Sequence, residues 1–173
     1  MSKNILILKS ICLLIFLLLF LIACNNRTQN NKKNNFKITL KARVLQDDKF
    51  QVFYVDEKNK GYSEDNRITT SVYKSQDFQE ITFLLSTIPL KFRIDLGENR
   101  YESIVEIEKV ILDNGNDKIE LDNSALHRFF ESNIYLKRVQ KGYSRKALDN
   151  RYDPFIESTP LLEKKIELQF SNL

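Results

Sequence analysis

The chain of 173 residues contains only 4 Gly and 3 Pro, a composition that excludes a fibrous or low-complexity protein. Lys and Arg number 27 against 23 Asp and Glu, so the formal net charge of +4 does not indicate a nucleic-acid partner. The length predicts one domain with a real hydrophobic core.

The first residues have the pattern of an export signal. Lys3 and Lys9 precede an apolar run, residues 11–23, which is too short for a transmembrane helix and typical of a secretory signal. The run ends in Leu-Ile-Ala-Cys at Cys24, which resembles the cleavage box of bacterial lipoproteins. This resemblance implies removal of residues 1–23 and a membrane anchor of acyl chains on Cys24. An uncleaved anchor and an ordinary signal peptide are the alternatives.

The mature chain predicted in this way has no disulfide framework. Cys12 lies in the removed segment, and the lipid blocks Cys24. Losing Lys3 and Lys9 lowers the formal charge to about +2. The segment 24–35 is Asn-rich and polar, so we expect a flexible tether ahead of a single domain, residues 36–173. Asn25 follows the cysteine, which by the same resemblance favours the outer membrane if the host has two membranes.

From Phe36 onward, hydrophobic and polar residues alternate with the period of a half-buried antiparallel strand. Turn residues separate short segments of this kind, and Asn114-Gly115 is a hairpin signal. The predicted strands are 36–45, 50–55, 67–73, 78–85, 90–96, 103–112 and 118–121. This spacing is typical of an all-β protein, an antiparallel β-sandwich.

The last third of the chain has a different pattern. Residues 122–133 predict one short helix, with Asp122 or Asn123 as its cap and apolar residues at helical spacing. Residues 134–160 are interpreted as loop-rich because Pro154 and Pro160 interrupt them. Residues 164–170 alternate again and predict a closing strand.

The segment Arg-Ile-Asp-Leu-Gly, residues 93–97, followed by an alternating strand, resembles galactose-binding-like β-sandwich domains, including the discoidin relatives. Upstream segments, over residues 36–112, resemble small accessory modules, carbohydrate-binding modules among them, of bacterial cell-surface glycan enzymes. The resemblance implies a jelly-roll sandwich with one short helix near its C-terminal third. It also implies carbohydrate binding at the cell envelope, although it does not assign ligand residues by position.

Candidate ligand residues come from the residue types instead. Tyr54, Tyr62 and Glu64 offer an aromatic surface and a polar group, the last two within a long loop. Arg93 and Asp95 are two residues apart in one predicted strand, so they point to the same face of the sheet. That face either binds a ligand or carries a simple surface ion pair.

Metal and enzyme sites find little support in the sequence. A structural calcium ion is one role for acids in the turns, and turn formation is the other. These acids are Asp47, Asp48, Asp113 and Asp117. The chain has one histidine, His127, no free thiol after lipidation, and no nucleophile elbow or phosphate loop. We therefore expect no catalytic site.

The segment 135–146 adds a further hypothesis, an anionic glycan or lipid surface, against a solvated loop as the alternative. Its basic residues are Lys137, Arg138, Lys141, Arg145 and Lys146. Taken together, the sequence predicts a non-catalytic, lipid-anchored envelope protein. It binds either a carbohydrate or, in an assembly role, a protein partner.

Overall fold

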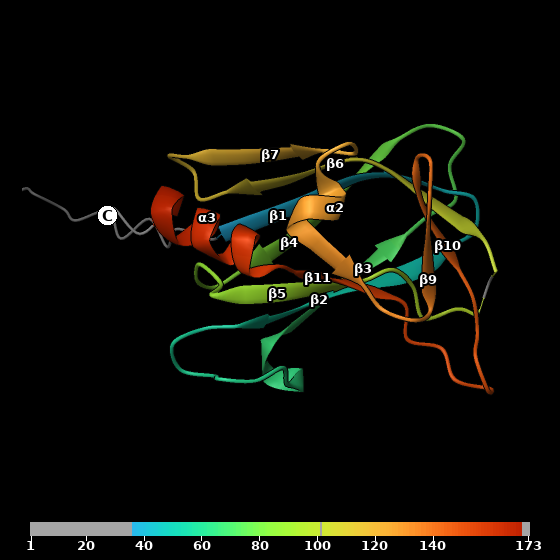
Figure 1. Cartoon of the computed structure of the whole chain (residues 1–173), viewed down its shortest axis with the longest axis horizontal. Helices are drawn as coiled ribbons and strands as arrows, with labels where there is room; N and C mark the ends of the chain where they lie inside the picture. Colours follow the sequence, from blue (N-terminus) through green and yellow to red (C-terminus); the bar gives the residue numbers. More distant parts are fainter. Residues whose placement is uncertain (1–35, 101, 171–173) are drawn as a thin grey trace, which may run out of the picture. The chain divides into compact units, whose positions relative to one another are not determined.

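The computed structural model describes residues 36–100 and 102–170. The signal, Cys24 and the tether therefore lie outside the described residues. Within them, two antiparallel sheets pack face to face on one core, which confirms the predicted mostly β protein with antiparallel pairing (Figure 1).

The first sheet has the strand order β4-β1-β6-β10-β9, and β7 pairs with the second half of β6. Its strands are β1 (Phe36–Val44), β4 (Gln79–Leu85), β6 (Ile104–Asp113), β7 (Lys118–Asp122), β9 (Leu136–Val139) and β10 (Gly142–Arg145). A register shift between Lys41 and Ala42 marks a bulge where β1 meets β6. On the outer face of this sheet, Lys37 pairs with Asp113 and Arg43 with Glu106, so these charges neutralise one another.

The second sheet has the order β3-β2-β5-β11-β8. Its strands are β2 (Asp48–Val55), β3 (Arg67–Val72), β5 (Lys91–Asp95), β8 (Phe130–Ser132) and β11 (Phe155–Ser158). Alternate residues of β5 point inward, so Phe92 and Ile94 are fully buried, while Arg93 points outward. The predicted outward direction of Arg93 is confirmed.

The predicted hairpin at Asn114-Gly115 is also confirmed. Asp113 and Lys118 pair across it, and Gly115 has a φ of 90°, a left-handed conformation that favours glycine. The Asn114 side chain accepts the N–H groups of Asn116 and Asp117, which fixes the turn.

The last third differs from the sequence-based prediction in three respects. The predicted helix is one turn, α2 (Leu126–Phe129), and no side chain caps it, because Asn123 instead donates to the carbonyl of Ile107. The segment read as loop contains the short strands β9, β10 and β11. The predicted closing strand is wrong, because residues 160–170 form the helix α3 (Pro160–Phe170).

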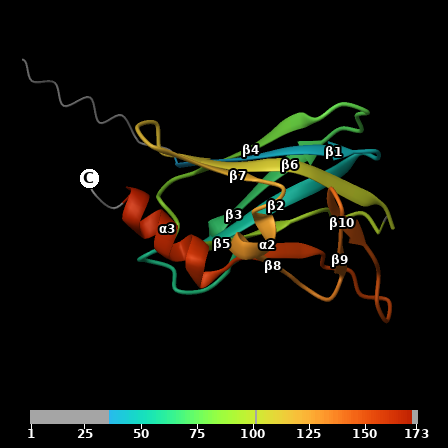
Figure 2. The same cartoon turned by 45° about the horizontal axis from the view of Figure 1, so that its top comes forward.

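The apolar residues of this segment fit both a strand period and a helix period, and the structure adopts the helix. Leu162, Ile166 and Phe170 recur every four residues and are buried, whereas Leu168, which the strand reading turned inward, is 63% exposed. Thr159 accepts the N–H of Leu162, and Pro160 occupies the first helical position. A further short helix, η1 (Glu64–Asn66), precedes β3. In both views α3 lies at one end of the sandwich and the β9–β10 hairpin at the other (Figure 2).

Candidate functional site

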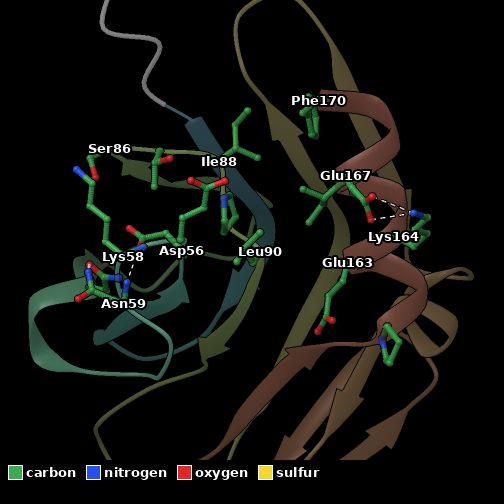
Figure 3. A pocket seen from close by; sticks show the side chains of 16 residues that line it. Asp56, Lys58, Asn59, Ser86, Ile88, Leu90, Glu163, Lys164, Glu167 and Phe170 are labelled. Carbon is green, nitrogen blue, oxygen red and sulfur yellow. Dashed lines mark hydrogen bonds and ion pairs between the residues drawn. The ribbon is translucent and has the colours of Figure 1, made fainter. Parts of the chain in front are cut away.

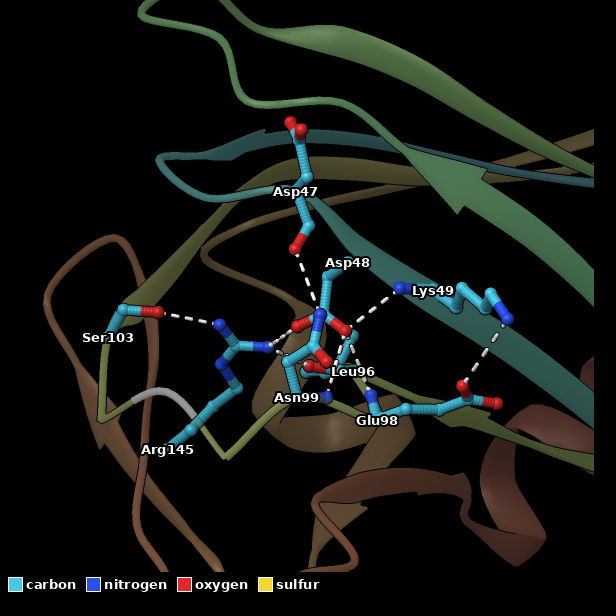
Figure 4. Close-up of polar contacts among 8 residues, drawn as sticks. All are labelled: Asp47, Asp48, Lys49, Leu96, Glu98, Asn99, Ser103 and Arg145. Carbon is cyan, nitrogen blue, oxygen red and sulfur yellow. Dashed lines mark hydrogen bonds and ion pairs between the residues drawn. The ribbon is translucent and has the colours of Figure 1, made fainter.

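A buried ion pair holds the end of the sandwich where β5 turns into β6. Arg145 of β10 donates to Asp48 at 2.6 Å and to the carbonyl of Leu96 at 2.7 Å, and both charged side chains are fully buried. Asp48 also accepts the backbone N–H groups of Lys49, Glu98 and Asn99 (Figure 4). We call this pair the Asp48–Arg145 clasp.

The clasp corrects two expectations from the sequence. Arg145 cannot contribute to an anionic-surface site, because strand β10 turns it and the buried Tyr143 inward. Asp48 is engaged by Arg145 and three N–H groups, which leaves it no role as a calcium ligand. Within the described part of the chain, no group of three or more His, Cys, Asp or Glu side chains is placed to hold a metal ion.

On the outer face of the second sheet, the structure brings Tyr62, Arg93 and Asp95 together. The Arg93 guanidinium lies over the rings of Phe53, Phe155 and Tyr62, with its carbon 4.7, 4.4 and 5.8 Å from the ring centres. Arg93 also donates to Asp95 at 3.0 Å. We call these residues the Arg93 cluster.

Burial controls the electrostatics of the Arg93 cluster. Burial raises the pKa of Asp95 to about 7; Arg93 opposes this shift and the nearby carboxylate of Asp153 adds to it. One oxygen of Asp95 and the Nε of Arg93 are buried with no hydrogen-bond partner among the described residues. Burial, followed by the hydrogen bond to Glu157, also raises the pKa of Tyr62 far above its ordinary value.

The other two predicted ligand residues lie elsewhere. Tyr54 is 4% exposed and belongs to the core, so it cannot stack on a ligand, which corrects the expectation. Its hydroxyl lies 3.1 Å from that of Ser86. Glu64 is exposed in η1 and forms an ion pair with Arg67 at 2.7 Å.

A groove of about 1160 Å³ lies at the end of the sandwich that carries α3. One wall is the loop after β2, a second is the loop between β4 and β5, and the third is α3 itself (Figure 3). Ile88, Leu90, Ile166 and Phe170 give the groove an apolar part. This volume accommodates a ligand of several sugar rings or a short peptide.

The loop walls of the groove are held in place by their own hydrogen bonds. Asp56 accepts the backbone N–H groups of Lys58 and Asn59 at 2.9 and 2.7 Å, which fixes the loop after β2. The N–H of Leu90 donates to the carbonyl of Val55, which ties the second loop to β2. A preformed site loses less entropy on binding than a flexible one.

The polar side chains of the groove are carboxylates, amides, hydroxyls and ammonium groups. Asn66 lines the groove and is 5% exposed, and its Nδ2 has no hydrogen-bond partner among the described residues. Its Oδ1 accepts a hydrogen bond from Asn59 at 3.1 Å. An unpaired buried donor is costly, so it marks a place where a ligand or water acceptor would be stabilised.

Sequence reasoning missed the α3 wall, which contributes Glu163, Lys164 and Glu167. The sequence nevertheless contained a signal for this helix. Thr159 followed by Pro160 is a helix start, and the apolar residues Leu162, Ile166 and Phe170 recur every four positions. The charge of Glu163 makes the smallest of the contributions that raise the pKa of Tyr62.

No helix among residues 36–100 and 102–170 has the length and apolar character needed to cross a membrane. No family model, curated protein or solved structure shows significant similarity to this chain.

Proposed function

We propose that this chain is a non-catalytic, lipid-anchored envelope protein that binds a carbohydrate in the groove beside α3. The observation that carries the proposal is the lining of that groove. Carboxylates, amides and hydroxyls from three separate segments surround an apolar part, and sugars present hydroxyl groups together with apolar ring faces.

The fold supports the same proposal. The two antiparallel sheets are compatible with the jelly-roll, galactose-binding-like sandwich that the segment 93–97 resembles. The single glycine of that segment has a structural role in this chain, since Gly97 makes room for the Asp48–Arg145 clasp. A shared fold does not by itself assign a ligand, so the groove carries the functional part of the proposal.

The anchor is part of the proposal. Lipidation of Cys24 after removal of residues 1–23 would attach the protein to a membrane through the polar segment 24–35, with the outer membrane favoured if the host has two. Such an anchor keeps a binding domain at the envelope surface, where glycans are concentrated.

The test is carbohydrate binding by residues 33–173, a compact unit whose described part contains its own core. We expect saturable binding to a member of a glycan array, followed by calorimetry on that glycan. Ser86→Ala, which removes a hydroxyl that lines the groove, should weaken binding, whereas Ser71→Ala, at an exposed serine of β3, should not. Absence of binding to every glycan, or equal binding by both variants, would overturn the proposal.

Binding of a protein partner is the second candidate. Leu45 and Tyr73 are 50% and 71% exposed, and two hydrogen bonds join their turns. The N–H of Ser75 donates to the carbonyl of Val44, and the N–H of Lys74 donates to the carboxylate of Asp47. Exposed apolar side chains of this kind are found at protein interfaces. Photo-crosslinking from position 73 in intact envelopes should yield a defined adduct if this function holds and none if it does not.

A further inference from the structure

The charges of the groove indicate which carbohydrates it would accept, and this inference rests on the proposed carbohydrate binding. The carboxylates that line the groove are Asp56, Glu57, Glu163 and Glu167, and the ammonium groups are Lys58 and Lys164. Lys164 lies 2.9 Å from both oxygens of Glu167, so this pair is neutralised within α3. Three carboxylates then remain against the single ammonium group of Lys58.

The carboxylates other than Glu167 lie on facing walls of the groove. Asp56 belongs to the loop after β2, and Glu163 leaves α3 on the side that faces that loop (Figure 3). One oxygen of Asp56 accepts hydrogen bonds from two backbone N–H groups. One oxygen of Glu163 accepts a long hydrogen bond of 3.4 Å from the Ser158 hydroxyl. Each carboxylate therefore has a second oxygen that these bonds leave for a ligand.

The electrostatic field of these carboxylates acts more strongly on a ligand charge in the groove than on an open surface. The low-dielectric walls displace water and concentrate the field lines. A uronic acid or sulfate brought between Asp56 and Glu163 meets like charges. An ammonium group in the same place is attracted by both walls and can donate to both carboxylates. Hydroxyl groups of the same sugar can bind the amide of Asn66 and the hydroxyl of Ser86.

We propose that the groove binds glycans with unsubstituted amino groups in preference to neutral or acidic glycans. The anionic-glycan hypothesis for residues 135–146 is the opposite expectation, and the burial of Arg145 already weakens it.

The experiment compares three tetrasaccharides of matched length by calorimetry on residues 33–173: glucosamine, N-acetylglucosamine and galacturonate tetramers. We expect the glucosamine tetramer to bind most tightly, with an affinity that falls as salt is raised. Glu163→Gln should lower its affinity about fivefold and lower the affinity of the N-acetylated tetramer by a smaller factor. Glu102→Gln, an exposed glutamate in the loop between β5 and β6, makes the same charge change at the other end and should alter neither.

The outcomes separate the two proposals. Tighter binding of the galacturonate tetramer, equal binding of the acetylated and free amino tetramers, or an unchanged Glu163→Gln variant would overturn the preference while carbohydrate binding stands. If none of the three tetramers binds but another glycan of the array does, the preference fails alone. If no glycan of the array binds, the proposed carbohydrate binding itself is overturned.

Discussion

Arg145 and Asp48 lie 97 positions apart in the sequence, yet they form a 2.6 Å ion pair with no exposed surface on either side chain. The pair joins the start of β2 to β10, which belong to different sheets. Breaking a buried pair from one side leaves an uncompensated charge in the core.

We therefore expect Arg145→Met to lower the free energy of unfolding by about 3–5 kcal/mol, measured by urea denaturation. Lys164→Met removes one partner of the exposed pair with Glu167 and should cost less than about 1 kcal/mol. Similar losses in the two variants would mean that the clasp does not stabilise the fold.

Gly97 should tolerate no side chain. Its φ of 125° is rare for other residues, and an added Cβ would collide with the Arg145 guanidinium and the Asp48 carboxylate. Gly97→Ala should therefore cost at least about 2 kcal/mol in thermal unfolding. Gly61→Ala is the matched control, because nothing lies within 4 Å of its added Cβ, and it should be within about 0.5 kcal/mol of the parent.

Asp95 should make stability depend on pH. Its pKa is about 7 in the folded chain against an ordinary value of 3.8, so the native state holds this proton more tightly. Its contribution is fully present below pH 4 and is lost as the pH rises towards 7, by on the order of 2–4 kcal/mol.

Asp95→Asn keeps the shape of the protonated form, so it should flatten the stability profile between pH 4 and 8. The difference between the Asp95→Asn variant and the parent is then largest at pH 8. Asp77→Asn, at an exposed carboxylate, controls for the change in charge. Parallel pH profiles for the parent and Asp95→Asn would contradict this account.

Tyr62 should stay protonated where an ordinary tyrosine titrates, because burial and its hydrogen bond to Glu157 raise its pKa. Tyr62→Phe should then leave the ultraviolet titration between pH 9 and 11 unchanged, while it costs about 1 kcal/mol through the lost hydrogen bond. Tyr73→Phe, at an exposed tyrosine, is the matched control for the lost hydroxyl and should stay within about 0.5 kcal/mol of the parent.

The proposed anchor makes a prediction for the full chain in cells. Cys24→Ala should abolish labelling with a palmitate analogue and shift the protein out of the membrane fraction. Cys12→Ala removes the other cysteine and should leave the label on the mature protein unchanged. Unaltered labelling of the Cys24→Ala variant would exclude a lipid on that residue.

The sheets could be predicted where alternation is long enough to be unambiguous. The pattern from Phe36 to Val44 fits only a strand, and the structure agrees. The four-residue strands β9 and β11 were missed because so short a segment has no measurable period. In α3, the alternation of Ile166, Leu168 and Phe170 indicated a strand, but the residues that are buried, Leu162, Ile166 and Phe170, recur every four positions as in a helix.

The site was less predictable than the fold, because it depends on packing between distant segments. Arg93 and Asp95 share a face by their spacing, which the sequence contains, but the rings over Arg93 come from β2, β11 and the loop of Tyr62. For Tyr54, the residue type suggested a ligand contact on the surface. Its position in the alternating strand β2 instead places its side chain in the core.

The order in which the groove acquires its walls follows from the place of α3 in the chain. Every strand from β1 to β11 has been synthesised by Ser158, so both sheets can pair before the helix exists. Phe170 then packs edge-on against Phe36 at 5.1 Å, bringing the last described residue against the first. The groove is thus complete only after Phe170 has been synthesised, and a chain cut after Ser158 would keep the strands of the parent yet lack the α3 wall.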